Sequence, residues 1–449
     1  MDLLENQTLK QIYDTENNKS EIINNNHSNE KIKYHETLFY DNDIPSYHNL
    51  GHQDQFKLNI TNNNIKIYTY TINNFKGVDN LILKSTFLES KTPSVELKEN
   101  LDCQIEFKWS HNLFNNMIKN ASLDLDSYNF PKLDNYIMDI NHNFFKRTLK
   151  QHKKNGKNLL NKWSTKLPEI PLYCYQPWFY SQSKNHFFPL FGLNNELKHH
   201  YVFNLNIFDL LCVRTRDNND EKWRYLKKEE FKFIKDNLIL SSDKMSDPIL
   251  YGNFRFLNEK EIDYLLKNQT ISRYVHKFIN IETSKCNTTM NLESCNLFVG
   301  NFTQKNEYLM IFWMLHNISS YEYNITSNYT DEIHELKNGD FPILKSSLEH
   351  LKNNIKKFNW DKNAVPLLDH YSNFSIEPLD IGYYVYNFTN EPNYSGCENG
   401  CDLQETNSSL KIYTDVLDYK YSLILKALCQ EKITFKFTKE ANKIKTEIF

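Results

Sequence analysis

The chain has 449 residues, of which 40% are hydrophobic and 14% aromatic, and its formal net charge is −3 at pH 7. This length allows two or three domains with sizeable cores. The near-neutral charge excludes the global basic field typical of proteins that bind a nucleic-acid backbone. We therefore expect no direct, sequence-specific contact with nucleic acid.

The first 35 residues differ from the rest of the chain, because they are polar, rich in asparagine and poor in apolar positions. Such a segment cannot offset the entropy of ordering by burial, so residues 1–35 predict a flexible N-terminal arm that orders only against a partner. The start, MDLLENQ, lacks the basic and apolar regions of a signal peptide. The longest apolar run, residues 309–315, is too short to span a bilayer. We expect a soluble protein made in the cytosol, in which most of the eight cysteines are buried thiols.

Alternating apolar residues, the pattern of half-buried strands, begin near residue 56 and recur at 65–72, 81–88 and 103–109. Residues 136–149 carry apolar positions at helical spacing and predict a short amphipathic helix. Residues 171–211 form an aromatic run cut by proline and glycine, which predicts buried strands joined by tight corners. Residues 214–235 are strongly charged and predict a long surface loop.

A helix start is predicted at Asn258, because Glu261 follows three residues later and can complete a capping box. Strand patterns flank this helix, at 249–257 before it and at 274–281, 297–302 and 308–316 after it. Further strands are predicted at 382–388, 410–413, 421–427 and 433–437, whereas residues 346–358 have helix-like spacing. The fold class is therefore all-β, with a first domain at 36–258, a linker helix at 259–270 and a second domain at 271–449. Each half looks like a sandwich or jelly roll, although no repeat relates their residues.

Motifs of enzymatic sites are missing from the sequence. It has no glycine-rich phosphate loop, no HExxH and no GxSxG motif, and only 10 glycines. His199 and His200 are adjacent on a predicted strand, so they point to opposite faces and cannot grip one metal ion together. Cys397 and Cys401 could form a zinc half-site or an oxidised pair, with free thiols as the default.

Other candidate residues have simple structural interpretations. The cluster Trp178, Phe179 and Tyr180 is expected to pack in the core rather than to form a sugar-stacking platform. The remaining charged candidates are expected to be solvated: the acidic pairs Glu229 with Glu230 and Asp217 with Asp220, and the basic loop at 150–157. The glycosylation sequons at Asn120, Asn301 and Asn387 carry little information in so asparagine-rich a chain. We assign no catalytic, cofactor-binding or metal-binding residue and expect no cofactor.

Five segments of the chain carry motifs of one protein family in the family's order. They lie at residues 76–90, 107–126, 177–205, 251–266 and 381–403. The third, PWFYSQSKNHFFPLFG, is the most diagnostic, although the arginine that commonly follows its Trp-Phe pair is replaced by Gln182. With these segments the chain resembles the double jelly-roll major capsid proteins of nucleocytoplasmic large DNA viruses and of the related virophages and polinton-like viruses.

The resemblance implies two consecutive eight-stranded jelly rolls with long loops and a few short helices. It also implies a non-enzymatic structural protein, with three chains forming a pseudo-hexagonal capsomer that tiles an icosahedral shell. Its partners would be neighbouring capsomers, minor capsid proteins and, through the arm, internal membrane proteins. It would be found in the virion after assembly in the host cytoplasm or virus factory. The alternatives are a jelly-roll receptor- or carbohydrate-binding surface protein, a minor capsid or scaffold paralogue, and a cupin-like enzyme with a metal site.

Overall fold

The computed structural model describes most of the chain from residue 47 onward. The described residues are 47–49, 52–57, 65–72, 80–98, 103–110, 113–125, 128–130, 132–144, 162–182, 186–193, 196–217, 223–225, 237–290, 293–317, 343–350, 358–361, 384–388, 400, 402–404, 408–415, 421–440 and 443–448. The arm predicted at residues 1–35 lies outside them.

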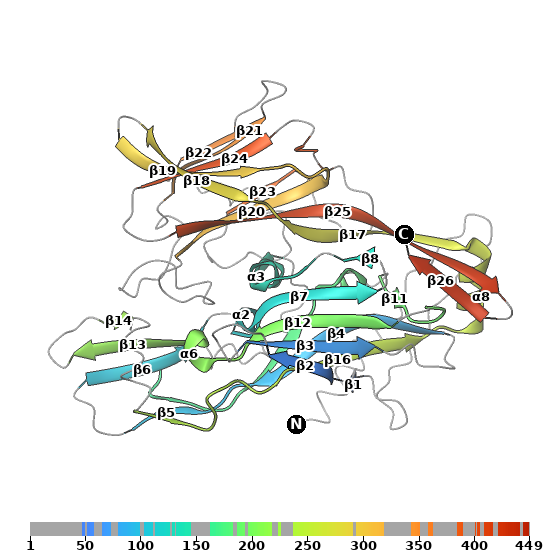
Figure 1. Ribbon diagram of the computed structural model, residues 1–449, viewed down its shortest axis with the longest axis horizontal. Helices are drawn as coiled ribbons and strands as arrows, with labels where there is room; N and C mark the ends of the chain where they lie inside the picture. Colours follow the sequence, from blue (N-terminus) through green and yellow to red (C-terminus); the bar gives the residue numbers. More distant parts are fainter. Residues whose placement is uncertain are drawn as a thin grey trace, which may run out of the picture.

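The N-terminal half contains a sandwich of two five-stranded antiparallel sheets (Figure 1). The first sheet has the order β1 (Tyr47–Asn49), β16 (Ile249–Phe256), β4 (Leu81–Lys91), β10 (Pro171–Tyr175), with β11 (Phe188–Pro189) also paired to β4. The second has the order β2 (His52–Lys57), β3 (Ile65–Ile72), β12 (Leu197–Asn204), β7 (Ile118–Leu125), β8 (Tyr128–Asn129). Alternate residues of these strands are buried, as the period of two predicts.

The C-terminal half repeats this arrangement. Its first sheet has the order β17 (Thr270–Asn280), β25 (Tyr421–Glu440), β20 (Glu307–Asn317), β23 (Tyr384–Asn387), with β26 (Lys443–Ile448) also paired to β25. Its second sheet has the order β18 (Thr283–Met290), β19 (Glu293–Asn301), β24 (Ser408–Asp415), β21 (Ile343–His350), β22 (Phe358–Asp361).

The two halves share one strand order although their sequences share no repeat. In each half, the opening strand of the first sheet lies beside the last long strand: β1 beside β16, and β17 beside β25. The second sheets correspond as well, since β3-β12-β7-β8 matches β19-β24-β21-β22, with one additional strand, β2 or β18, at the same edge. This is the strand order of a jelly roll. The fold is a double jelly roll, as predicted.

Two three-stranded sheets extend from the first jelly roll, at the lower left of Figure 1. They have the orders β14 (Arg224–Tyr225), β13 (Leu211–Asp217), β6 (Cys103–Trp109) and β15 (Leu238–Leu240), β5 (Val95–Leu97), β9 (Lys166–Leu167). The helices are short: α2 (Leu113–Met117), α3 (Asn135–Phe144), η1 (Phe179–Ser181), α6 (Ile207–Leu210) and α8 (Glu259–Asn268). None of the helices in the described part of the chain has the length and apolarity to cross a bilayer.

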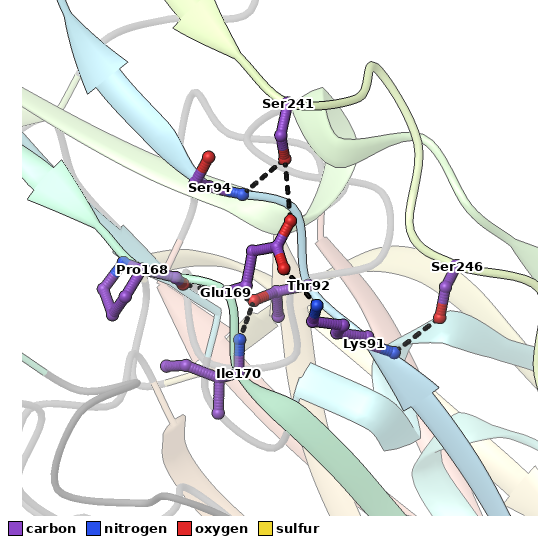
Figure 2. A network of polar contacts seen from close by, with 8 residues as sticks. All are labelled: Lys91, Thr92, Ser94, Pro168, Glu169, Ile170, Ser241 and Ser246. Carbon is purple, nitrogen blue, oxygen red and sulfur yellow. Dashed lines mark hydrogen bonds and ion pairs between the residues drawn. The ribbon is translucent and has the colours of Figure 1, made fainter.

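A polar network holds the corner where β4 leads into the sheet of β5, β9 and β15 (Figure 2). Glu169 pairs with Lys91 and accepts a hydrogen bond of 3.3 Å from the Ser241 hydroxyl, which in turn accepts one of 2.9 Å from the Ser94 N–H. The hydrogen bond and charge of Lys91 lower the pKa of Glu169. Three chain segments are thereby fixed at this corner, which sets the direction of the extension.

Two predicted elements are wrong in type. Residues 346–358 are not helical where the structure describes them, because β21 and β22 occupy 343–350 and 358–361. Leu348 lies opposite Leu410 in the pairing of β21 with β24, so this ladder outweighs the helical spacing. The loop predicted at 214–235 is also wrong in part. Residues as far as Asp217 belong to β13, which pairs with β6, and Arg224 and Tyr225 form β14.

One further correction concerns the end of the chain. The strands predicted separately at 421–427 and 433–437 are a single strand, β25, of 20 residues. The polar residues between them suggested a break, but β17 pairs with β25 continuously from Lys426 to Lys436. Glu431, in this polar stretch, is ion-paired with Lys277 on β17 at 3.0 Å. A cross-strand ion pair thus continues the strand through a segment that looks like a turn.

Candidate functional site at the junction of the two halves

The diagnostic segment around Trp178 lies where the first jelly roll meets the second. The buried ring of Phe435 on β25 packs against three phenylalanine rings of this segment, with centroid distances of 6.5 Å to Phe179, 6.3 Å to Phe187 and 6.2 Å to Phe188. A second stacked pair joins Phe191 and Phe437 at 5.7 Å. Aromatic pairs at these distances are favourable and bury large areas. The hydrophobic core is therefore continuous across the junction.

Gln182 completes the free edge of β17 at this junction. Its side-chain oxygen accepts the N–H of His276 at 2.9 Å, and its side-chain nitrogen donates to the carbonyl oxygen of the same residue. The amide thus behaves like a peptide group of a neighbouring strand. Arginine has no hydrogen-bond acceptor and could make only half of this contact. The residue that departs from the family motif is therefore one that ties the two halves together.

A buried ion pair forms another contact between the halves. Lys426 on β25, whose side chain is 7% exposed, pairs with Asp134, which lies just before α3 in the N-terminal half. The same carboxylate accepts the N–H of Ile137 at 2.8 Å and so caps α3. Tyr136 adds a cation–π contact, with its ring centre 5.4 Å from the Lys426 ammonium. Figure 1 shows α3 between β7 and the strands β17 and β25.

The C-terminal strand β26 also reaches the first jelly roll. Thr446 donates its N–H to the carbonyl oxygen of Gly192 and its hydroxyl to that of Phe191, both at 2.8 Å. Gly192 has φ 70°, a left-handed conformation that favours glycine. The turn at Gly192 therefore presents two successive carbonyl groups to β26.

A polar network fills the core beside this junction. The hydroxyl of Tyr180 lies 2.8 Å from Nε2 of His199 and 3.0 Å from the hydroxyl of Thr86. Trp178 donates to the Tyr201 hydroxyl at 3.4 Å. Burial lowers the pKa of His199 to about 3 and raises that of Tyr180. These groups are neutral at pH 7, which is suited to a structural role.

The sequence candidates in this region lie as predicted. Trp178, Phe179 and Tyr180 are buried, which rules out a sugar-stacking platform formed by these rings. Pro189 and Leu190, within the run at 171–211 that predicts buried strands, are also buried.

The two adjacent histidines point to opposite faces, as predicted. His199 is buried, while the Nδ1 atom of His200 lies 2.9 Å from the Thr69 hydroxyl. Within the described ranges, no three His, Cys, Asp or Glu side chains come together as a metal site.

Most other candidates lie outside the described residues: Cys397, Cys401, Glu229, Glu230, Asp220 and the loop at 150–157. Asp217 ends β13. Of the sequons, Asn120 is half-buried in β7, Asn301 is exposed at the end of β19, and Asn387 ends β23. Four cysteines are buried thiols, as expected: Cys174, Cys212, Cys295 and Cys429.

The ion pair of Lys426 with Asp134 was not predicted from the sequence. The available signal was a lysine within the apolar run LILKAL of a predicted strand, because a lysine in such a run is buried only when it is paired. The partner could not be found from the sequence, since it lies 292 residues away in the other half.

Comparisons with known proteins support the fold. No protein-family model and no curated protein sequence matches the chain. Among solved structures, the PBCV-1 virus capsid model is similar with a TM-score of 0.57 and 9% identity, covering 88% of this chain and 95% of the other. The Faustovirus major capsid protein gives 0.56 and 8%, covering 92% and 93%, and the Sputnik virophage structure gives 0.50 and 9%, covering 95% and 91%. The chain thus has the double jelly-roll fold of viral major capsid proteins over nearly its full length.

Proposed function

We propose that the chain is a structural protein of a viral capsid. The observation that carries this proposal is the double jelly-roll fold, which the chain shares with viral capsid proteins across 88–95% of its length. A fold by itself does not determine function, but the junction adds support from the side chains. Stacked phenylalanines, the Gln182 amide and the buried ion pair of Lys426 fix one jelly roll against the other. A building block of a shell requires such rigidity.

We further propose that three chains form a pseudo-hexagonal capsomer. Each chain supplies two blocks with the same strand order, so three chains supply six similar blocks around a threefold axis. We propose that the chain divides into two domains, 36–258 and 271–449, joined by a linker helix at 259–270. This division is supported by the sheets, because none of those in the described residues combines strands from before and after α8. In the virion, its partners would be neighbouring capsomers and minor capsid proteins. The N-terminal arm at residues 1–35 would bind internal membrane proteins. We propose no catalytic role.

The test is the mass of the purified full-length chain in sedimentation velocity at micromolar concentration. The expected species has the mass of three chains, and a stable monomer would contradict the trimer. Electron microscopy of concentrated trimer should then show particles about as wide as two jelly rolls with sixfold-like outlines. Quantitative mass spectrometry of virions separates the remaining candidates, because a major capsid protein would be the most abundant chain and a minor paralogue would not.

A further inference from the structure

A ladder of cations and indole rings covers one face of the sheet β14-β13-β6, in the extension of the first jelly roll. Arg214 lies over two rings, with its guanidinium carbon 4.6 Å from the centre of Trp163 and 4.2 Å from that of Trp223. Lys108 lies 4.8 Å from Trp163 at one end, and Arg216 lies 4.9 Å from Trp223 at the other. We call these five residues the cation–indole ladder.

The pairing of the strands sets the ladder in place. Arg214 and Arg216 are two residues apart on β13 and so point to the same face of the sheet. Val213, which precedes Arg214, and Thr215, which lies between the two arginines, are buried on the opposite face. Trp163 precedes Ser164, whose N–H and carbonyl pair with Phe107 on β6 at 2.9 and 2.8 Å.

Trp223 is anchored from the other edge of the sheet. It directly precedes β14, which pairs with β13. The two indoles therefore approach the same face from opposite edges of the sheet.

The ladder is positively charged and only half-buried. Among the described side chains, Glu106 lies opposite Arg214 on β6 and accepts a hydrogen bond of 2.7 Å from its Nε. Arg216 donates to the side-chain oxygen of Gln104. These contacts hold the two guanidinium groups in place while Lys108 and Arg216 remain partly exposed at the ends. In the part of the chain that the structure describes, this face therefore carries three cations and the carboxylate of Glu106, and this balance favours an anionic partner.

The form of the ladder identifies the class of anion. Each indole already contacts two cations, which leaves little ring face on which a nucleic-acid base could stack. A guanidinium stacked on a ring keeps its N–H groups in its own plane, where they can pair with the oxygens of a carboxylate or sulfate. Because the cations are held in a row, binding a polymer with repeated anions costs little side-chain entropy.

We propose that the cation–indole ladder binds an anionic polysaccharide, with sulfate or carboxylate groups at Lys108 and Arg216 and sugar rings along the indole edges. This role is separate from shell assembly and does not depend on it. It would give the extension of the first jelly roll an attachment function that the jelly-roll cores do not provide.

The test uses heparin as the probe and the purified full-length protein in about 0.15 M salt, where long-range charge effects are largely screened. The variant Lys108→Gln/Arg216→Gln removes the charge at both ends, and we expect it to weaken binding by about tenfold or more. The variant Arg216→Lys keeps the charge but loses the planar group, so an intermediate loss is expected. Thermal melting of each variant checks that it is folded.

The matched control is Lys432→Gln/Lys439→Gln, which changes the net charge by the same amount at two exposed positions of β25. It should bind heparin within about twofold of the natural protein. Three results would overturn the proposal: no heparin binding by the natural protein, equal losses in the two double variants, or equal binding of heparin and polyglutamate. Sedimentation velocity of the same samples measures whether the trimer forms, so failure of the trimer proposal can be distinguished from failure of the heparin-binding proposal.

Discussion

At the scale of single residues, the junction depends on a lysine whose burial makes its partner essential. We predict that Asp134→Asn costs about 3 kcal/mol of unfolding free energy, because it leaves the charge of Lys426 buried without its counter-charge. Asparagine still caps α3, so the loss reports the ion pair and not the cap.

Removing the other charge of the pair, by Lys426→Met, should cost less unfolding free energy, about 1 kcal/mol. Asp134 is the more exposed partner, at 21%, and it remains at the start of a helix, where a negative charge is favourable. Urea unfolding of both variants measures the difference. Equal losses would contradict the prediction that the unpaired buried lysine costs more than the unpaired carboxylate.

Two buried histidines predict a loss of stability in mild acid. Burial lowers the pKa of His199 to about 3 and that of His186 to about 4, from an ordinary value of 6.5. The charge of His200 also lowers the pKa of His199, and those of Arg273, Lys84 and His276 lower the pKa of His186. The hydrogen bond between His186 and the Phe179 carbonyl acts in the opposite direction, but burial outweighs it.

The unfolded chain therefore binds more protons than the folded chain below pH 6.5, so stability falls as the pH falls. Each histidine contributes about 2 kcal/mol to this loss by pH 5. Urea unfolding at pH 7 and pH 5 tests the sign and size. His199→Gln should remove about half of the difference, and a pH-independent midpoint in the natural protein would contradict the prediction.

At the scale of elements, α8 shows how local sequence specifies a local structure. The Asn258 side chain accepts the N–H of Glu261 at 2.9 Å, and the Glu261 carboxylate accepts the N–H of Asn258 at 2.8 Å. Glu261 also pairs with the buried Arg255 at 2.7 Å. Both bonds of the capping box were expected from the spacing of the two residues alone.

We predict that Asn258→Ala lowers the unfolding free energy by about 1 kcal/mol, because the first turn of α8 loses its side-chain acceptor. Asn258→Ser keeps an acceptor and should stay within about 0.5 kcal/mol of the natural protein. Chemical denaturation measures both. If the two variants lose the same stability, the cap does not contribute.

At the scale of the whole molecule, Phe435 makes three of the ring contacts through which β25 packs against the first jelly roll. We predict that the natural protein melts in one calorimetric transition and that Phe435→Ala separates it into two. The substitution removes three ring contacts across the junction and should cost about 3–5 kcal/mol.

The control is Phe298→Ala on β19, because both phenylalanines are 2% exposed but Phe298 lies in a sheet of the C-terminal half alone. Phe298→Ala should cost a similar amount of unfolding free energy but leave a single calorimetric transition, because Phe298 lies within the C-terminal half. If Phe435→Ala still melts in one transition, the halves are coupled mainly by other contacts.

Elements that depend on short-range pattern could be predicted from the sequence. Alternation located β3 and β6, the Asn258 to Glu261 spacing located α8, and five ordered segments indicated the double jelly roll. Elements that depend on pairing between distant segments could not be predicted, because their partners are set by the fold. Residues 343–350 form a strand because they pair with β24, although a helix was predicted from residue 346 onward. The two strands predicted at 421–427 and 433–437 are one strand, β25, because β17 pairs with it continuously. The roles of Gln182 and Lys426 emerged for the same reason: a side chain that bonds across a junction has partners tens or hundreds of residues away, and no local pattern encodes them.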